Sequence, residues 1–169
     1  MTFCCLRRNA ALNFSLDYHE FLEYLPVIRK YQELALKHGI RDVFQDNGGK
    51  VLQIILTLNL KIVPGRHGND VFDELSQYEL KTLNTELQKN FTSHHHLNSK
   101  IIDKYRKVPW LFAVYKDIEL QKVYRLDAHA LEPIFTKWEQ KINLSGKDLN
   151  NPKISLKFVV QHGKLIFES

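Results

Sequence analysis

Two neighbouring β-patterned segments in the second half of the chain most constrain its fold. Residues 108–115, Val-Pro-Trp-Leu-Phe-Ala-Val-Tyr, form an apolar run typical of a buried strand. Residues 118–124 follow almost at once and predict the strand beside it. Two further strands are predicted at residues 154–160 and 164–167, on either side of His162-Gly163. A β-sheet must therefore form the centre of the molecule.

Helical spacing of apolar residues predicts helices on either side of these strands in the sequence. Residues 17–38 show this spacing and end at Gly39, a plausible helix stop, while Pro26 is expected in the first turn of a second helical piece. Residues 128–141 predict another helix, with Asp127 placed to cap it. The apolar positions are Leu22, Leu25, Ile28, Tyr31, Leu34 and Ala35 in the first segment, and Leu131, Ile134, Phe135 and Trp138 in the second.

The segment between the first helix and the apolar run completes the predicted order of elements. Asp46-Asn47-Gly48-Gly49 is a strong turn signal. Residues 51–63, rich in Ile, Leu and Val, predict one or two strands that end at Pro64-Gly65, and residues 78–83 predict a short strand. The order helix, central strands, helix, late strands predicts an α+β domain with a mixed central sheet flanked by helices.

Composition limits the class of protein. A length of 169 residues and 44% hydrophobic residues suit one domain, expected over residues 17–169, after a flexible extension at residues 1–16. No apolar run suggests a membrane span or a secretory signal, and two adjacent cysteines, Cys4 and Cys5, favour a reducing cytoplasm. The 24 Lys and Arg against 19 Asp and Glu hint at a polyanionic partner.

The residues from Asp70 to Lys81 carry the clearest chemistry. Glu79 and Lys81 alternate along a predicted strand and so project to one face, and Asp70 on an adjoining hairpin arm can approach Glu79. Two carboxylates suit a hard cation such as Mg²⁺, which polarises a phosphodiester, while an ammonium can hold the attacking water. This is the Asp…Glu-x-Lys pattern of a large nuclease superfamily. Taken alone, it more often belongs to a strand with a solvated Glu/Lys face.

A second cluster of polar residues suits base recognition. His94, His95 and His96 are consecutive, so they suit a solvated loop or contacts to base edges in the major groove better than a single metal ion. Asn150 and Asn151 fit the same role, since asparagine pairs in bidentate fashion with adenine, although an Asn pair before a proline is often a plain turn.

Taken together, these segments resemble the PvuII family of type II restriction endonucleases from about residue 17 to the C-terminus. The resemblance implies a homodimer that embraces double-stranded DNA and cuts the palindrome CAGCTG in its centre to blunt ends, with helices around residues 21–38 at the dimer interface. The matching stretches are residues 31–40, 44–50, 64–66, 68–70, 78–81, 94–96 with Asn98, 101–102, 104–106, 108–110 and 150–154.

The resemblance also assigns roles to single residues. It implies that Asp70 and Glu79 bind Mg²⁺, that Lys81 positions or activates water, and that Tyr105 lies beside the scissile phosphate. The implied DNA contacts are Asp46 from the minor-groove side, Thr92, His94 as a support for its neighbours, and the readers His95, His96, Asn150 and Asn151.

Some positions depart from the family pattern. His67 stands where the family has a Glu, the Asp70–Glu79 spacing is one residue shorter, and Thr92-Ser93 inverts the family's order. Two alternatives stay open: the same chemistry with another target sequence, or a DNA-binding protein that no longer cleaves. A companion methyltransferase in the host is expected, without a stable complex.

Overall fold

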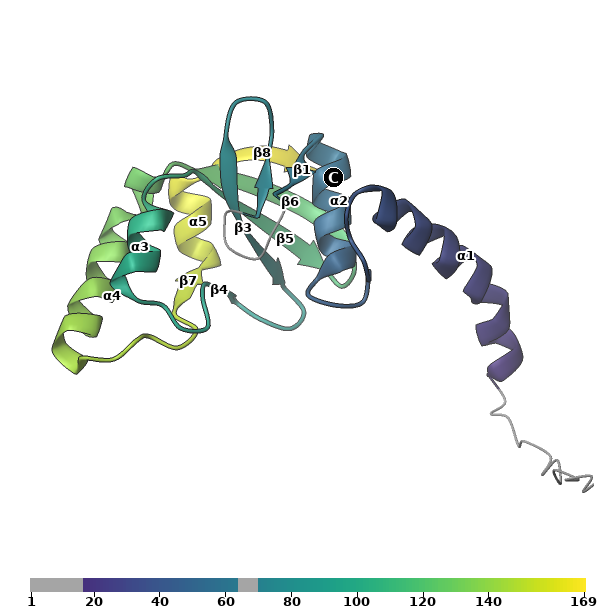
Figure 1. Ribbon diagram of the computed structural model, residues 1–169, viewed down its shortest axis with the longest axis horizontal. Helices are drawn as coiled ribbons and strands as arrows, with labels where there is room; N and C mark the ends of the chain where they lie inside the picture. The colour runs from purple at the N-terminus through teal and green to yellow at the C-terminus, as the bar shows by residue number, and fades with distance from the viewer. Residues whose placement is uncertain (1–16, 64–69) are drawn as a thin grey trace, which may run out of the picture.

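The computed structural model describes residues 17–63 and 70–169, so the expectations for residues 1–16 and for His67 lie outside the described residues. The described part of the chain begins with two helices, and strands and helices are mixed along the rest of it (Figure 1). The helices are α1 (Tyr18–Lys37), α2 (Gly48–Leu58), α3 (Ser99–Tyr105), the 3-10 helix η1 (Ala128–Leu131), α4 (Glu132–Ser145) and α5 (Leu156–His162). The strands are β1 (Lys61–Ile62), β2 (Val71–Phe72), β3 (Gln77–Asn84), β4 (Asn90–Thr92), β5 (Trp110–Lys116), β6 (Glu119–Leu126), β7 (Lys153–Ser155) and β8 (Lys164–Glu168).

A mixed sheet of six strands forms the centre of the described chain, in the order β1-β2-β3-β5-β6-β8. Strands β3 and β5 are parallel, and the other neighbours are antiparallel. Strands β4 and β7 form a separate antiparallel pair. The α+β class and the mixed sheet predicted from the sequence are confirmed.

Each face of the sheet packs its own core, because side chains alternate along the strands. One core joins α2 to the face that carries Leu111 and Ala113 of β5, and the other lies under α3, α4 and α5 against the face that carries Trp110 and Phe112. Helices therefore pack against both faces of the sheet.

Helix α1 points away from this body (Figure 1) and exposes large apolar side chains along much of its length. Pro26 lies inside the helix, so the prediction that it begins a second helical piece is wrong. The proline is exposed, and the carbonyl that loses its partner can therefore bond to water. The exposed apolar residues of α1 are Phe21, Leu22, Tyr24, Val27, Leu34 and Leu36.

The strands predicted at residues 51–63 are wrong over most of that range, where the chain forms α2 and only the short β1. The buried residues Leu52, Ile54 and Ile55 fit one face of a helix as well as a strand. The helix ends at Asn59, whose backbone has a positive φ of 52° and whose N–H returns to the carbonyl of Ile55. Tertiary burial has overridden the strand preference of the β-branched residues.

The strand predicted at residues 154–160 is also wrong, since β7 ends at Ser155 and α5 begins at Leu156. The Ser155 hydroxyl accepts the N–H of Phe158 and caps the new helix, a signal that outweighs the alternating apolar residues. The predicted helix at residues 128–141 is confirmed as η1 followed by α4, but the Asp127 side chain makes no capping bond.

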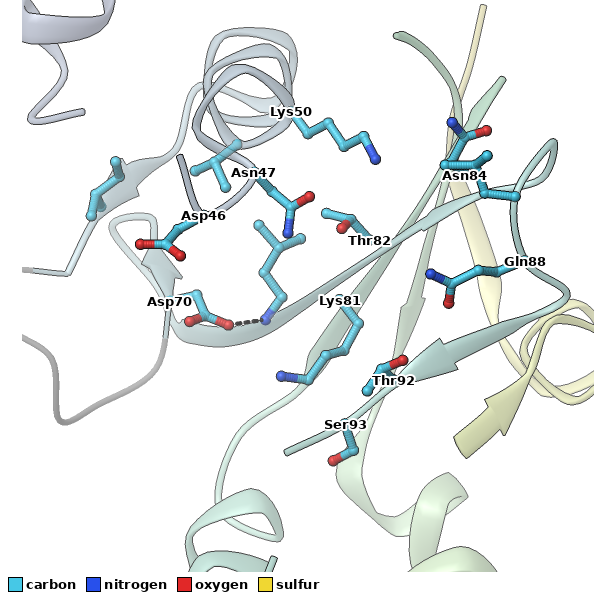
Figure 2. Close-up of a pocket in the computed structure, with 14 residues that line it drawn as sticks. Asp46, Asn47, Lys50, Asp70, Lys81, Thr82, Asn84, Gln88, Thr92 and Ser93 are labelled. Carbon is cyan, nitrogen blue, oxygen red and sulfur yellow. Dashed lines mark hydrogen bonds between the residues drawn. The ribbon is translucent and has the colours of Figure 1, made fainter. Parts of the chain in front are cut away.

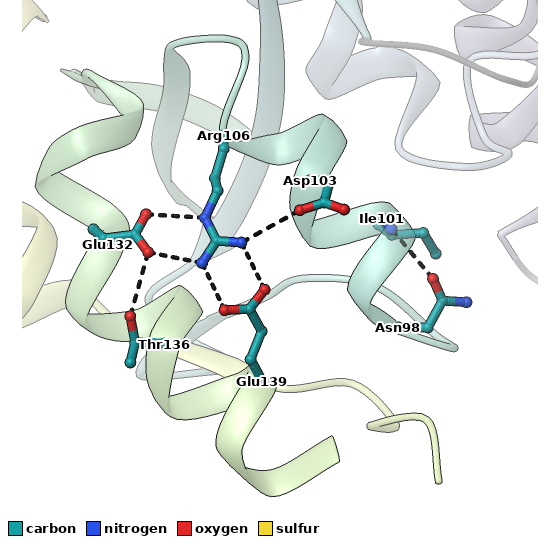
Figure 3. Close-up of polar contacts among 7 residues, drawn as sticks. All are labelled: Asn98, Ile101, Asp103, Arg106, Glu132, Thr136 and Glu139. Atoms are coloured by element: carbon teal, nitrogen blue, oxygen red, sulfur yellow. Dashed lines mark hydrogen bonds and ion pairs between the residues drawn. The ribbon is translucent and has the colours of Figure 1, made fainter. Parts of the chain in front are cut away.

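Arg106, just after α3, ties that helix to α4 (Figure 3). Its guanidinium donates two hydrogen bonds to Glu132, at 3.0 and 2.7 Å, and two to Glu139, at 2.6 and 2.7 Å. Asp103 adds a longer contact at 3.4 Å. Paired N–H groups facing a carboxylate fix orientation as well as distance. These hydrogen bonds therefore fix the position of α3, with Tyr105 at its end, relative to α4.

Candidate active site

The β2–β3 hairpin carries Asp70 to the outer edge of β3. Strand β2 pairs with β3 only at Gln77 and Tyr78, so no strand continues that edge beyond Tyr78. The Asp70 carboxylate occupies the next position, where its Oδ2 accepts the backbone N–H of Leu80 at 2.9 Å (Figure 2). No described residue forms a hydrogen bond with the other carboxylate oxygen.

Glu79 and Lys81 project from the same face of β3, as their spacing predicts, and form an ion pair of 2.6 Å between Nζ and Oε1. Glu79 is only 5% exposed and is the one charged residue that is buried among those described. Burial raises the pKa of Glu79 above its ordinary value, and the nearby charge of Asp70 adds to the rise, while Lys81 opposes it. Glu79 and Lys81 are thus poorly solvated, while the nearby Asp70 is exposed.

Two aromatic rings enclose Lys81. Its Nζ lies 5.7 Å from the ring centres of both Tyr105 and Trp110, which pack edge to face at 4.6 Å. Burial raises the pKa of Tyr105, and the charge of Glu79 raises it further, so its hydroxyl stays neutral near pH 7. The buried Ser93 Oγ lies near this hydroxyl without a well-directed hydrogen bond. A neutral Tyr105 hydroxyl can donate a hydrogen bond to a group bound at this site.

A cavity of about 600 Å³ opens beside these residues, between α2, the edge of β3 and β4 (Figure 2). It brings together four residues singled out from the sequence: Asp46, Asp70, Lys81 and Thr92. Sequence reasoning missed its other polar lining residues, Asn47, Lys50, Thr82, Asn84, Gln88 and Ser93, which come from segments distant in the chain.

The histidine run and the asparagine pair lie side by side, since β4 ends just before the histidines and its antiparallel partner β7 begins just after the asparagines. The backbone N–H of Asn151 donates to the carbonyl of His94 at 3.0 Å, and Nδ1 of His95 lies 3.1 Å from Oδ1 of Asn151. An amide oxygen can only accept, so this contact requires a proton on Nδ1 of His95. His96 and Asn150 are exposed beside them. The structure thus brings the predicted readers into one platform.

His94 supports this platform from the active-site side. Its Nδ1 accepts the backbone N–H of His96 at 3.1 Å. Burial and the positive charge of Lys81 lower the pKa of His94, so the ring is neutral near pH 7 and can accept that bond. At the other side of β4, Thr92 Oγ1 accepts from Lys153 Nζ at 2.6 Å. The platform is therefore joined to the cavity through Thr92, Ser93 and His94.

Asp70 and Glu79 fit a hard divalent cation that keeps several of its waters. No group of three or more His, Cys, Asp or Glu side chains is found in the described part of the chain, so a site with only protein ligands is not built there. Mg²⁺ is usually held by one or two carboxylates together with water and substrate phosphate. Asp70 repels the negative charge of Glu79, and a bound cation would reduce this repulsion.

The chain was compared with models of known protein families. Residues 16–167 match the model of the restriction endonuclease PvuII. The match covers nearly the whole chain and includes the site described above.

Proposed function

Because the chain belongs to the family of the restriction endonuclease PvuII, and is thus a type II site-specific deoxyribonuclease, we propose that it cuts double-stranded DNA at CAGCTG with Mg²⁺ and leaves blunt ends. The observation that carries this proposal is the meeting of Asp70, Glu79 and Lys81 at one strand edge, next to a cavity and a platform of exposed imidazoles and amides.

Asp70 and Glu79 would hold the metal ion, since type II restriction endonucleases generally use divalent metal ions. When bound, Mg²⁺ supplies positive charge that polarises the phosphodiester and makes a nearby water more acidic. For Glu79 to act as a ligand it must give up its proton, which its raised pKa delays to a higher pH than for an ordinary carboxyl.

Lys81 and Tyr105 would act on the reacting groups directly. The Lys81 ammonium, held by Glu79 and the two rings, can orient a water for attack on phosphorus and offset the charge that builds on the phosphate. The neutral Tyr105 hydroxyl can donate a hydrogen bond to a phosphate oxygen. Both groups lie in a dry environment, where such interactions are stronger than in water.

The platform would read the bases. In the major groove, a neutral His95 ring with its proton on Nδ1 can accept at Nε2 from an adenine or cytosine amino group, and Asn150 and Asn151 can pair with adenine. His96 would reach the same groove, and Thr92 and His94 would fix the neighbouring contacts. Asp46, at the opposite side of the cavity, would approach from the minor-groove side.

A palindrome read by a two-fold dimer implies two copies of this site. We place the dimer interface on α1, whose exposed apolar residues have no covering element among those described. No helix in the described part of the chain is both long and apolar enough to cross a membrane. The proposed setting is host defence in the cytoplasm, with a methyltransferase that protects host DNA but forms no stable complex.

Digestion of a plasmid that carries one CAGCTG site tests the proposal. We expect one blunt cut at that site with Mg²⁺ and none with EDTA. Cutting at another sequence would keep the chemistry but overturn the proposed specificity. Specific binding by a folded protein without any cut would favour a DNA-binding protein that no longer cleaves.

A further inference from the structure

Asn47 lines the same cavity as Asp46, Asp70 and Lys81, but the reaction described above does not use it (Figure 2). It lies between Asp46 and the first turn of α2, and its side chain is exposed. In Figure 2 its amide points into the space between α2 and the edge of β3. The cavity thus holds an amide next to the carboxylates and the ammonium of the proposed site.

The amide of Asn47 has no role in holding α2. An asparagine at a helix N-terminus usually caps the helix by accepting a backbone N–H with its side chain. Asn47 instead has a left-handed backbone, φ 62° and ψ 23°, and its side chain makes no such bond. Its backbone carbonyl accepts the N–H groups of Lys50 and Val51, at 2.8 and 2.9 Å. Both the donor and the acceptor of the amide are therefore left for a ligand, with no hydrogen-bond partner among the described residues.

The backbone around Asn47 is held by contacts that do not involve the Asn47 side chain. Gly48 packs so closely on residues 40–43 that a Cβ there would lie 2.4 Å from the carbonyl oxygen of Asp42. The Tyr31 hydroxyl donates to the carbonyl of Gly49 at 3.0 Å, and the side chain of Gln32 accepts the N–H of Val43 at 3.0 Å. The backbone that carries the amide is therefore held by contacts with α1 and does not depend on bonds of the Asn47 side chain.

We infer that the Asn47 amide is a specificity contact to a base edge in the minor groove, beside Asp46. This inference rests on the proposed function, which brings duplex DNA to the cavity. A carboxylate such as Asp46 only accepts, and guanine N2 offers the one donor of the minor groove. The remaining groups of that groove are acceptors, N3 of the purines and O2 of the pyrimidines. The Asn47 amide supplies the hydrogen-bond donor that Asp46 lacks, so the two side chains together can contact both donor and acceptor groups of the bases.

The variant Asn47→Gly tests this inference, because glycine accepts the left-handed backbone and removes only the amide. Asn59→Gly is the matched control: Asn59 also has a positive φ, at the other end of α2, and does not line the cavity. The measurement is kcat/KM on a CAGCTG duplex and on duplexes with one changed base pair. We expect Asn47→Gly to reduce the ratio between cognate and changed duplexes by about tenfold, and Asn59→Gly to leave it unchanged.

Two results would overturn the inference. If Asn47→Gly discriminates between the duplexes as well as Asn59→Gly does, the amide contacts no base edge. An equal loss on every duplex would show contact with the phosphate backbone in place of a base edge. A wild-type protein that does not cut CAGCTG would instead count against the proposed function, so the two failures are distinguishable.

Discussion

At the scale of the residue, Glu79 is a buried carboxylate next to another carboxylate. Because its pKa is raised in the folded protein, the folded state binds its proton more tightly than the unfolded state does. The free energy of unfolding therefore falls as pH rises from the ordinary value of 4.5 through the raised pKa, and the penalty is complete above it. A group that costs stability at neutral pH is typical of a site kept for function.

We predict that Glu79→Gln abolishes cleavage but raises Tm at neutral pH when no divalent cation is present. The amide removes the buried charge, and the stabilising difference from wild type should vanish below about pH 4.5, where both side chains are neutral. Cleavage should fall by at least about 100-fold, since even outer partners of metal sites are worth 10- to 100-fold. Thermal unfolding at several pH values, together with a nuclease assay, checks both parts. A lower Tm at neutral pH would contradict this view of Glu79.

His95 and Asn151 are predicted to act as one recognition unit because their side chains contact each other at 3.1 Å. Substituting either by alanine should weaken discrimination between cognate and near-cognate duplexes by roughly 1–3 kcal/mol. The double variant should lose clearly less than the sum of the two. Binding titrations of the four proteins in the cycle measure this coupling. Strict additivity would mean that the two residues read the DNA independently.

At this scale, the sequence revealed the residues whose chemistry is distinctive by type and spacing. Glu79 and Lys81 share a face because side chains alternate on a strand, and the structure bears this out. Asn47 was visible as part of a turn and, with Lys50, as part of the matching stretch at residues 44–50, but neither was assigned a role. Their place in the cavity depends on how α2 packs beside β3, and no local pattern contains that information.

At the scale of the element, Arg106 stabilises the contact of α3 with α4 through Glu132 and Glu139. Its hydrogen bonds lower the pKa of both glutamates from the ordinary value of 4.5. This stabilisation is complete above pH 4.5 and is lost as pH falls through the lowered pKa values.

We predict that Arg106→Ala lowers the free energy of unfolding by about 1–3 kcal/mol at neutral pH, at the low end because the glutamates are partly solvated. The difference from wild type should shrink as the pH is lowered below 4.5. Arg125→Ala is the matched control, since Arg125 makes a single exposed ion pair with Asp127. Urea unfolding at two pH values provides the measurement. Equal losses of unfolding free energy in the two variants would show that the Arg106 hydrogen bonds add nothing beyond an ordinary surface ion pair.

The sequence predicted well those elements whose residue pattern fits only one type of secondary structure. The run at residues 110–116 is apolar and short, and the paired strand β6 follows after one tight turn. Residues 51–58 and 156–162 fit both helix and strand, and their state depends on packing and on a cap at Ser155. Short elements such as α3 and β4 lack any periodic signal and went unpredicted.

At the scale of the whole molecule, the exposed apolar side chains of α1 have no covering element among those described, and we propose that a second copy of the chain covers them. We predict that Val27→Asp, at a residue 65% exposed in the single chain, weakens dimerisation by about tenfold or more, because a charge would be buried in the interface. The control is Leu144→Asp, at an apolar residue 88% exposed on α4. Sedimentation at several concentrations distinguishes them. Unchanged dimerisation of Val27→Asp would move the interface away from this part of α1.

The central claim is that Asp70 and Glu79 serve cleavage by a sequence-specific nuclease. The most direct test compares wild type with Asp70→Asn on one CAGCTG duplex in Mg²⁺, measuring binding and cutting on the same samples. We predict that both proteins bind the duplex specifically and that only wild type cuts it, because the carboxylate serves the transition state more than docking. Cutting by Asp70→Asn at the wild-type rate would contradict the account.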